Sequence, residues 1–287
     1  MTELVLSLFP GIDLLGRGFE AEGFCVVRGP DLLFGGDIRE FHPPTDRFDG
    51  VIGGSPCQDF SKARRGLPPT GYGLEMLSEF VRCVLEASPA WFLLENVPSV
   101  PDIQVPGYTV QRFDLNANEC GLRQDRLRHF QFGSCDGSIL VPSRMITTGS
   151  TSPTCTATEG KRKDRRTWAD FCELQGLPRD FDLPGWPVSA KYRAVGNGVP
   201  VPMASVIARA IQNATPRPGV RLCICGCGRI VHGKHVSATP ACRKRMERRR
   251  KRDRSCVTMP GTDTTPVTQF GLFAIAESHV TELLPTR

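Results

Sequence analysis

The stretch that decides the fold reads Asp49-Gly-Val-Ile-Gly-Gly-Ser-Pro-Cys57-Gln-Asp-Phe-Ser61. Residues 49–52 have the alternating, β-branched pattern of a strand, and Gly53, Gly54 and Pro56 are the turn residues that end it. Catalytic residues are concentrated in the loops that follow such strands. Cys57 lies at the tip of this turn and is therefore a candidate nucleophile. The alternative is a buried structural thiol, which is common for intracellular cysteines.

A strand, a tight turn and a helix precede this stretch. Residues 4–9 (LVLSLF) are mostly apolar, Pro10-Gly11 follows as a turn, and residues 12–19 carry apolar side chains at helical spacing. In a doubly wound sheet the first such turn lies under the cofactor, because glycine lets the backbone approach and the helix N-terminus offers free N–H groups. The sequence therefore predicts an α/β fold with a doubly wound, mostly parallel sheet.

Two acidic residues follow the second predicted strand, residues 24–27. Asp31 lies where an acid accepts hydrogen bonds from ribose hydroxyls, and Asp37 lies where an acid meets an adenine amino group. The alternative for each is a solvated loop carboxylate. Their order along the chain favours a nucleotide-like cofactor.

An acid and three further polar residues are expected in the middle of the chain. Residues 74–87 have the apolar stripe of a sheet-covering helix, and residues 90–94 form a buried strand that delivers Glu95 at its end. Loss of water there raises a carboxyl pKa, as a proton donor at neutral pH requires. After a strand at 107–116, three polar residues alternate and share one face if extended: Gln124, Arg126 and Arg128. The alternative is an edge-strand charge pattern.

The remaining elements predict a division of the chain. Residues 1–132 form the catalytic domain and residues 133–187 a small, irregular second lobe with a short helix at 167–176. Residues 188–214 return to the catalytic domain through a Gly196-Asn197-Gly198 turn and a final helix at 203–212.

These pieces, in this order, resemble the DNA cytosine-5 methyltransferases over residues 4–211. Ser-Pro-Cys57-Gln-Asp-Phe-Ser61 is similar to their nucleophile loop, Glu95-Asn96-Val97 to their Glu-Asn-Val motif and Gln124-Asp-Arg126-Leu-Arg128 to their Gln-x-Arg-x-Arg motif. The resemblance implies a Rossmann-like methyltransferase with the catalytic residues Cys57, Glu95, Arg126 and Arg128. It implies that S-adenosylmethionine is bound by Phe9, Gly11, Ile12, Asp13, Asp31, Asp37, Ile38, Pro56, Asn197 and Val199.

The implied chemistry explains these residue types. Cytosine C5 is a poor nucleophile, so a Cys57 thiolate adds at C6 and converts the ring to an enamine that attacks the methyl group. Glu95 donates a proton or a strong hydrogen bond to N3, and Arg126 and Arg128 favour the thiolate. The target cytosine must be flipped out of a DNA duplex or already be single-stranded.

The chain departs from the family in its short insert, because a substantial target-recognition domain usually lies there. The C-terminal region supplies a candidate replacement. Residues 217–254 contain thirteen Lys and Arg but two acids, in a chain of net charge +6. Within residues 217–256, four cysteines resemble the ligands of a zinc module: Cys223, Cys225, Cys227 and Cys242. The basic run after Cys242 predicts nonspecific DNA contacts, and residues 257–287 a linker and tail.

The composition and N-terminus predict a soluble, cytoplasmic protein that is encoded by a prokaryote or a virus. The sequence shows no secretory signal pattern and no apolar run of membrane-spanning length. We expect a monomer that acts on DNA, with a restriction enzyme as a candidate partner. Two alternatives remain: a methyltransferase of cytosine in RNA, which uses the same chemistry, and a DNA-binding regulator that retains the fold without catalysis.

Overall fold

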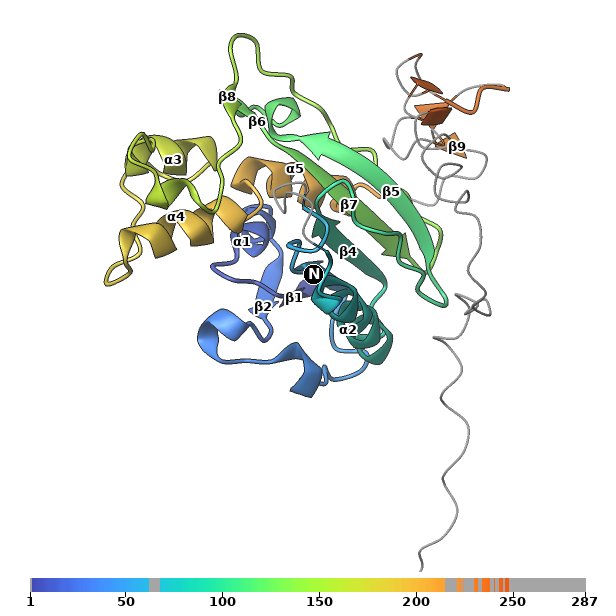
Figure 1. Ribbon diagram of the computed structural model, residues 1–287. Coiled ribbons are helices and arrows are strands. Elements are labelled where there is room, and N and C mark those ends of the chain that lie inside the picture. Colours follow the sequence, from blue (N-terminus) through green and yellow to red (C-terminus); the bar gives the residue numbers. More distant parts are fainter. Residues whose placement is uncertain are drawn as a thin grey trace, which may run out of the picture. The chain divides into compact units, whose positions relative to one another are not determined.

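The computed structural model describes residues 2–61 and 68–214 and, beyond them, 221–222, 224, 230–231, 234–237, 240, 243–244 and 246–247. The centre of the fold is a six-stranded sheet with the order β2-β1-β3-β4-β7-β5 (Figure 1). Its strands are β1 Leu4–Leu8, β2 Cys25–Arg28, β3 Gly50–Gly54, β4 Trp91–Asn96, β5 Thr109–Asn116 and β7 Leu127–Ser134. The first four are parallel, whereas β7 pairs antiparallel with both β4 and β5. The predicted α/β class with a mostly parallel sheet is confirmed.

Helices cover both faces of this sheet. α1 Leu14–Ala21 and α5 Val201–Gln212 pack together on one face, and α2 Tyr72–Ala87 covers the other (Figure 1). The alternation along β1 shows why: Val5 belongs to the core under α1 and α5, whereas Leu6 belongs to the core under α2. A strand buried on both faces reads as a continuous apolar run, as residues 4–8 do.

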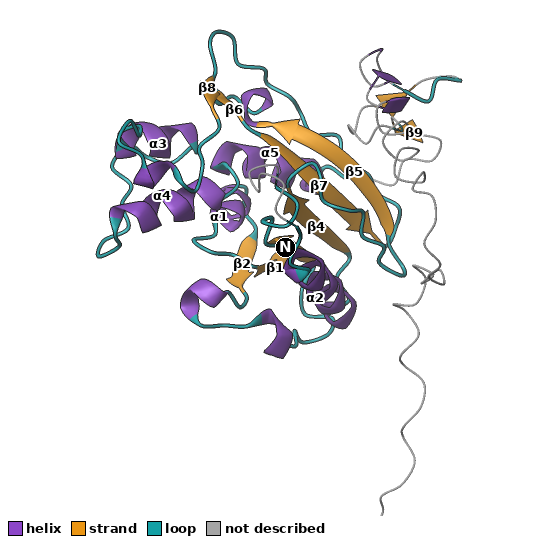
Figure 2. Cartoon of the chain, viewed as in Figure 1, coloured by secondary structure: helices purple, strands orange, loops and turns teal. Residues whose placement is uncertain are grey.

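A smaller helical lobe follows the sheet in sequence (Figure 2). It contains the 3-10 helix η5 Glu159–Lys161, α3 Trp168–Leu174 and α4 Val188–Asn197. Its core is aromatic, with the rings of Phe171 and Tyr192 4.7 Å apart, and Leu14 of α1 packs into the same cluster. A two-stranded sheet of β6 Gln124–Asp125 and β8 Ser152–Pro153 leads into this lobe.

The remaining described elements are short. They are the 3-10 helices η1 Leu32–Phe34, η2 Ile38–Glu40 and η4 Ala117–Glu119, and the paired strands β9 Arg221–Leu222 and β10 Ile230–Val231.

Two elements differ from the sequence prediction. The first helix was expected from residue 12, but it begins at Leu14 because the Asp13 side chain accepts a hydrogen bond from Gly16 N and caps it. The Gly196-Asn197-Gly198 segment was expected to be a turn, yet Gly196 and Asn197 end α4, a helix that the sequence did not predict. Burial of Tyr192 and Val195 against Phe171 stabilises that helix.

One described stretch, residues 188–212, is long and apolar enough by length and composition to cross a membrane. It consists of α4 and α5, which are separated at Gly198 and Pro200. Its buried residues pack in the cores described above, as expected of core helices in a soluble domain.

Candidate active site

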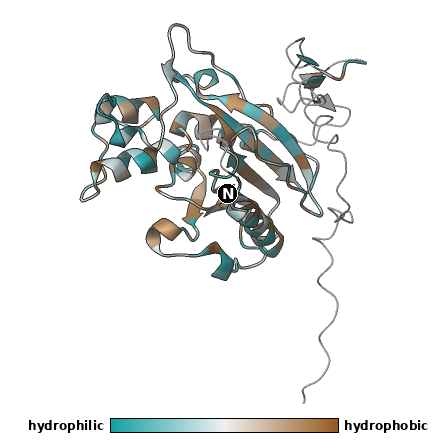
Figure 3. Ribbon diagram, viewed as in Figure 1, coloured by the Kyte–Doolittle hydropathy of each residue, from teal (hydrophilic) through white to brown (hydrophobic). Residues whose placement is uncertain are grey.

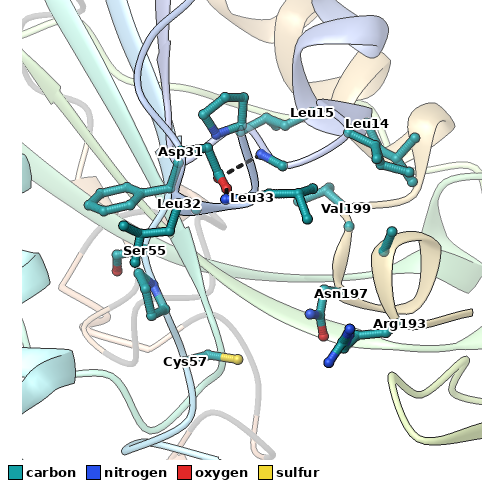
Figure 4. Close-up of a pocket in the computed structure, with 18 of the residues that line it drawn as sticks. Leu14, Leu15, Asp31, Leu32, Leu33, Ser55, Cys57, Arg193, Asn197 and Val199 are labelled. Atoms are coloured by element: carbon teal, nitrogen blue, oxygen red, sulfur yellow. Dashed lines mark hydrogen bonds between the residues drawn. The ribbon is translucent and has the colours of Figure 1, made fainter. Parts of the chain in front are cut away.

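Cys57 follows the carboxyl end of β3 and lies in a cavity of about 630 Å³. The loop turns tightly, since Phe60 N donates to Cys57 O at 3.0 Å. Figure 4 shows the Cys57 sulfur on one wall of this cavity and Arg193 and Asn197 on the facing wall. The volume falls in the range of ligand-binding pockets.

Glu95 and Arg128 reach the same cavity from adjacent strands. The Arg128 Nε lies 3.0 Å from Glu95 Oε1. Glu95 of β4 stands opposite Phe130 of β7, so Arg128, two residues along β7, points to the same face. Glu95 is 8% exposed, which makes this a largely desolvated ion pair. The antiparallel pairing of β4 and β7 therefore brings together the acid and one of the two predicted arginines.

Electrostatics in this cavity favour neutral forms of both reactive groups. Burial raises the pKa of the Cys57 thiol, the Glu95 carboxylate raises it further, and Arg128 and Arg126 lower it. Burial likewise raises the pKa of Glu95, against the opposing effect of Arg128, Arg126 and His129. The arginines do favour the thiolate, but burial outweighs them, so the pKa of the thiol lies above its ordinary value.

Asn96 holds the ends of β3 and β4 in register. Its Nδ2 donates to Ser55 O at 3.0 Å and to Ser55 Oγ at 2.9 Å, and its Oδ1 accepts from Val97 N at 2.8 Å. Asn96 is buried, so these bonds are made in a region from which water is excluded. They fix the start of the Cys57 loop against the strand that carries Glu95.

The other end of the cavity is formed by the turn after β1. Phe9 has φ of 52° and Gly11 has φ of 53°, so both lie in the left-handed region. That conformation costs energy for a non-glycine residue, and such strain is typical of functional loops. Asp31 Oδ2 accepts from Gly11 N and Oδ1 from Leu33 N, each at 2.8 Å (Figure 4). Each carboxylate oxygen has a second lone pair, so Asp31 retains acceptor capacity toward the cavity.

Asp37 and Ile38 complete this end. Asp37 caps η2 and accepts hydrogen bonds from Arg39, which hold its pKa below the usual range. Beside it, η1 presents an apolar and exposed surface (Figure 3), and its Leu32 and Leu33 line the cavity. Carboxylates next to apolar side chains suit a ligand with a flat ring and a sugar.

Most of the predicted cofactor residues line this cavity. They are Phe9, Gly11, Ile12, Asp31, Asp37, Ile38, Pro56, Asn197 and Val199. Asn197 lies at the end of α4, and Val199 follows it where Gly198 approaches Leu14 closely: a Cβ on Gly198 would lie 2.7 Å from Leu14 Cδ1.

Asp13 and Arg126 depart from the predicted arrangement, because neither lines the cavity. Asp13 is 1% exposed; its Oδ1 accepts hydrogen bonds from Ser7 Oγ and Gly16 N, and its Oδ2 forms an ion pair with the Arg28 guanidinium, so its carboxylate serves the fold. Arg126 is fully buried and donates to Cys155 O at 2.7 Å, Gly196 O at 2.9 Å and Gly198 O at 2.8 Å. It ties the small lobe to the segment that carries Asn197.

Sequence reasoning missed several residues that line the cavity: Leu32, Leu33, Tyr72, Met76, Trp186 and Arg193. Arg193 precedes Asn197 by four residues and so shares a face of α4 with it, but the sequence did not predict that helix. The others come from segments that are far apart in the sequence and are brought together only by the fold.

The predicted zinc ligands Cys223, Cys225, Cys227 and Cys242 lie outside the described residues. Within the described part of the chain, no group of three or more His, Cys, Asp or Glu side chains is arranged to hold a metal ion. Zinc binding stays a prediction.

Curated relatives match part of the chain. The Type II methyltransferase M.FnuDI of Fusobacterium nucleatum is 32% identical over 161 residues, which are 45% of this chain and 46% of the relative. The Type II methyltransferase M.HgiDI of Herpetosiphon aurantiacus is 37% identical over 100 residues, 31% of this chain and 32% of the relative. The chain thus spans about half the length of these relatives or less.

Solved structures share the fold. The Entamoeba histolytica methyltransferase EhMeth superimposes with a TM-score of 0.56 at 10% identity, over 74% of this chain and 98% of that one. A Spodoptera frugiperda DNMT2 variant gives 0.52 at 12% identity, over 74% of this chain and all of the other. At such identities the likeness shows a common fold alone.

The family comparison goes further, because it covers most of the described chain. The family described as C-5 cytosine-specific DNA methylase matches residues 34–159 and 143–213, which include Cys57, Glu95, Arg128 and Asn197. That match spans more than half of the sequence. The chain belongs to the C-5 cytosine-specific DNA methylase family.

Proposed function

We propose that this protein transfers a methyl group from S-adenosylmethionine to C5 of cytosine in DNA through a covalent bond between Cys57 and C6. The observation that carries the proposal is that Cys57, the Glu95–Arg128 ion pair and Asp31 line one cavity. A nucleophile and an acid at one end, and a carboxylate beside a glycine turn at the other, match a reaction between a base and a nucleoside-type donor.

The cavity fits the methyl donor. Asp31 has remaining acceptor capacity for ribose hydroxyls, and Leu32 and Leu33 offer apolar contact to an adenine ring. Asp37 accepts from an exocyclic amino group at the same end. Gly11 and Asn197 line the same cavity, and we assign to them the contacts with the methionine part of the donor. When bound there, S-adenosylmethionine supplies an electrophilic methyl group.

The residues around Cys57 carry out the base chemistry. The thiol loses its proton, and the thiolate forms a bond to C6 while protonated Glu95 donates to N3, so that the electron pair of the C5–C6 bond becomes available at C5. Arg128 orients the Glu95 carboxyl and balances the charge of the thiolate. After C5 gains the methyl group it loses its proton to a base, and elimination of the Cys57 thiolate restores the ring.

The substrate is DNA whose cytosine leaves the base stack. Cys57 lies within a cavity, so a stacked cytosine does not reach it, and extrusion costs a few kcal/mol. The family description, C-5 cytosine-specific DNA methylase, favours DNA over RNA, and the names of the relatives as Type II methyltransferases support a restriction and modification context. We propose that the protein acts as a monomer in the cytoplasm.

Covalent trapping tests this proposal. A DNA that contains 5-fluorocytosine blocks removal of the C5 substituent, so we expect a protein–DNA adduct that survives denaturing electrophoresis in the presence of S-adenosylmethionine. Cys57→Ser abolishes the adduct, whereas Cys25→Ser, an exposed cysteine outside the cavity, retains it.

The alternatives give other outcomes. Methyl transfer to tRNA without transfer to DNA supports an RNA methyltransferase. DNA binding by the unaltered protein, without transfer or adduct, supports a regulator and overturns the proposed reaction.

A further inference from the structure

α4 separates two cavities. Pro187, before its first turn, and Ala190, Arg193 and Asn197 line the active-site cavity. Val188, Lys191 and Tyr192 line a second cavity of about 500 Å³ on another side of the same helix. The remaining lining residues of the second cavity come from the segment before α3 and its first turn: Lys163, Arg165, Arg166, Thr167 and Trp168. One helix therefore connects the catalytic site to a second concave surface.

The second cavity is positively charged. Four cationic side chains line it, and no acidic side chain does. Arg166 is paired with Glu159 at 2.8 Å and Lys191 with Asp182 at 2.5 Å. Lys163 and Arg165, both exposed, form no ion pair with a described residue; Arg165 donates to Arg162 O at 3.2 Å. Two cationic charges are therefore left for a ligand.

Arg193 provides a third such charge on the active-site side of α4. It is exposed, it lies on the wall that faces Cys57 (Figure 4), and it forms no hydrogen bond or ion pair with any described residue. Uncompensated cations thus stand on both sides of one helix. A cytosine ring is neutral and does not require them, whereas a DNA strand carries a phosphate at every nucleotide.

We propose that α4 and the segment before α3 hold the backbone of the substrate strand, with Arg193 of α4 binding a phosphate beside the extruded cytosine and Lys163 with Arg165 binding a second phosphate of the same strand. The inference rests on the proposed function only in taking the strand to be DNA. Arg suits this task because its planar fork of donors matches phosphate oxygens. Phosphate contacts position a strand without reading its sequence, which agrees with the short insert between β7 and α4.

Salt-dependent binding tests the proposal. The affinity of the full-length protein for a fluorescent single-stranded oligodeoxynucleotide with one central cytosine is measured by anisotropy from low to high salt, in a Cys57→Ser background that prevents turnover. Each lost phosphate contact lowers the slope of log K against log salt by about 0.7. We expect Arg193→Gln to lower this slope by the amount of about one phosphate contact. The double variant Lys163→Gln/Arg165→Gln lowers it by the amount of about one to two contacts.

Arg179→Gln is the matched control. Arg179 is an exposed cation of the same lobe, but it is paired with Asp170 and Glu173 and lines neither cavity. We expect Arg179→Gln to leave the salt slope unchanged. Retention of the melting temperature and of S-adenosylmethionine affinity shows that each variant is folded.

Several results overturn the inference. One is an unchanged salt slope in both the Arg193 and the Lys163–Arg165 variants. Another is an equal decrease of the slope in Arg179→Gln. A third is a decrease of the slope for an RNA oligonucleotide without a decrease for the DNA oligonucleotide. Inorganic phosphate that competes at millimolar concentration with the same residue dependence shows a site for free phosphate and also overturns it. A protein that fails to methylate DNA but shows the slope changes overturns the proposed function and leaves the strand-binding site intact.

Discussion

Arg128 Nε lies 3.0 Å from Glu95 Oε1, and the two side chains act on Cys57 in opposite directions. The Glu95 carboxylate raises the pKa of the thiol, whereas the Arg128 guanidinium lowers it. The antiparallel register of β4 and β7 holds the two side chains together. Their opposing effects on the Cys57 pKa are therefore a consequence of strand pairing. The pKa of the Cys57 thiol therefore depends on two residues from different strands.

The first prediction is that substitutions in this pair shift the Cys57 pKa in opposite directions. Glu95→Gln removes a negative charge and lowers it; Arg128→Gln removes a positive charge and raises it. Alkylation of Cys57 as a function of pH, followed by peptide mass analysis, reports both shifts. Cys25 is exposed and lies outside the cavity, and its alkylation profile serves as the unchanged reference. Shifts of the same sign would contradict this account.

Activity and thiol reactivity separate in the Glu95 variant. Glu95→Gln makes the thiolate easier to form but removes the proton donor to N3, so we expect methyl transfer to fall by about 10²-fold or more. A variant with a more reactive thiol and lower activity distinguishes acid catalysis from thiolate formation as the role of Glu95.

A second prediction concerns stability and pH. Burial raises the folded-state pKa of Glu95 above its ordinary value of 4.5. A raised carboxyl pKa means that the folded state favours the protonated form, so its stabilising contribution is complete below pH 4.5 and is lost as pH rises through the folded pKa. Glu95→Gln lacks this titration. We expect the free energy of unfolding of the variant, relative to the unaltered protein, to increase as the pH rises above 4.5, measured by urea denaturation at a series of pH values.

Parts of this site could be predicted from the sequence because local patterns determine them. The alternation and turn residues around Cys57 indicate a strand that ends at a loop, and the apolar run before Glu95 indicates burial of the carboxyl group. The surroundings of Arg126 could not be predicted. The alternating pattern predicts which face of the strand carries Arg126. The carbonyl groups that Arg126 binds, however, belong to residues 29, 70 and 72 positions away in the sequence. Only the folded small lobe brings them to it.

Tertiary packing also determines α4, which the sequence alone does not predict. Glycine and asparagine at its end indicate a turn by local propensity, whereas packing of Tyr192 against Phe171 makes the segment helical. Arg193 lines the active-site cavity because that helix forms. The sequence shows that residue 193 is cationic, but it does not show that the side chain lies at the cavity.

A third prediction follows from the burial of Arg126. Arg126→Met removes three hydrogen bonds to carbonyl groups in a region without water, and we expect a loss of about 3–5 kcal/mol in the free energy of unfolding. Arg193→Met, an exposed arginine on the adjoining helix, is the control and changes stability by about 0.5 kcal/mol or less. Equal stability of the two variants in urea denaturation would show that the carbonyl contacts of Arg126 do not support the fold.

The fourth prediction concerns Asp31 and the methyl donor. Asp31→Ala removes the acceptor proposed for the ribose hydroxyls and also releases Gly11 N, with which Asp31 Oδ2 forms a 2.8 Å bond. We expect calorimetric affinity for S-adenosylmethionine to fall by about 10- to 100-fold, because a hydrogen bond to a charged group contributes about 1.5–3 kcal/mol. Asp136→Ala, in a loop outside the cavity, retains full affinity. Asp31→Asn keeps one carbonyl oxygen for Gly11 N but loses the charge, so an intermediate affinity assigns part of the effect to the turn. Unchanged affinity in both Asp31 variants would mean that the donor does not contact this carboxylate.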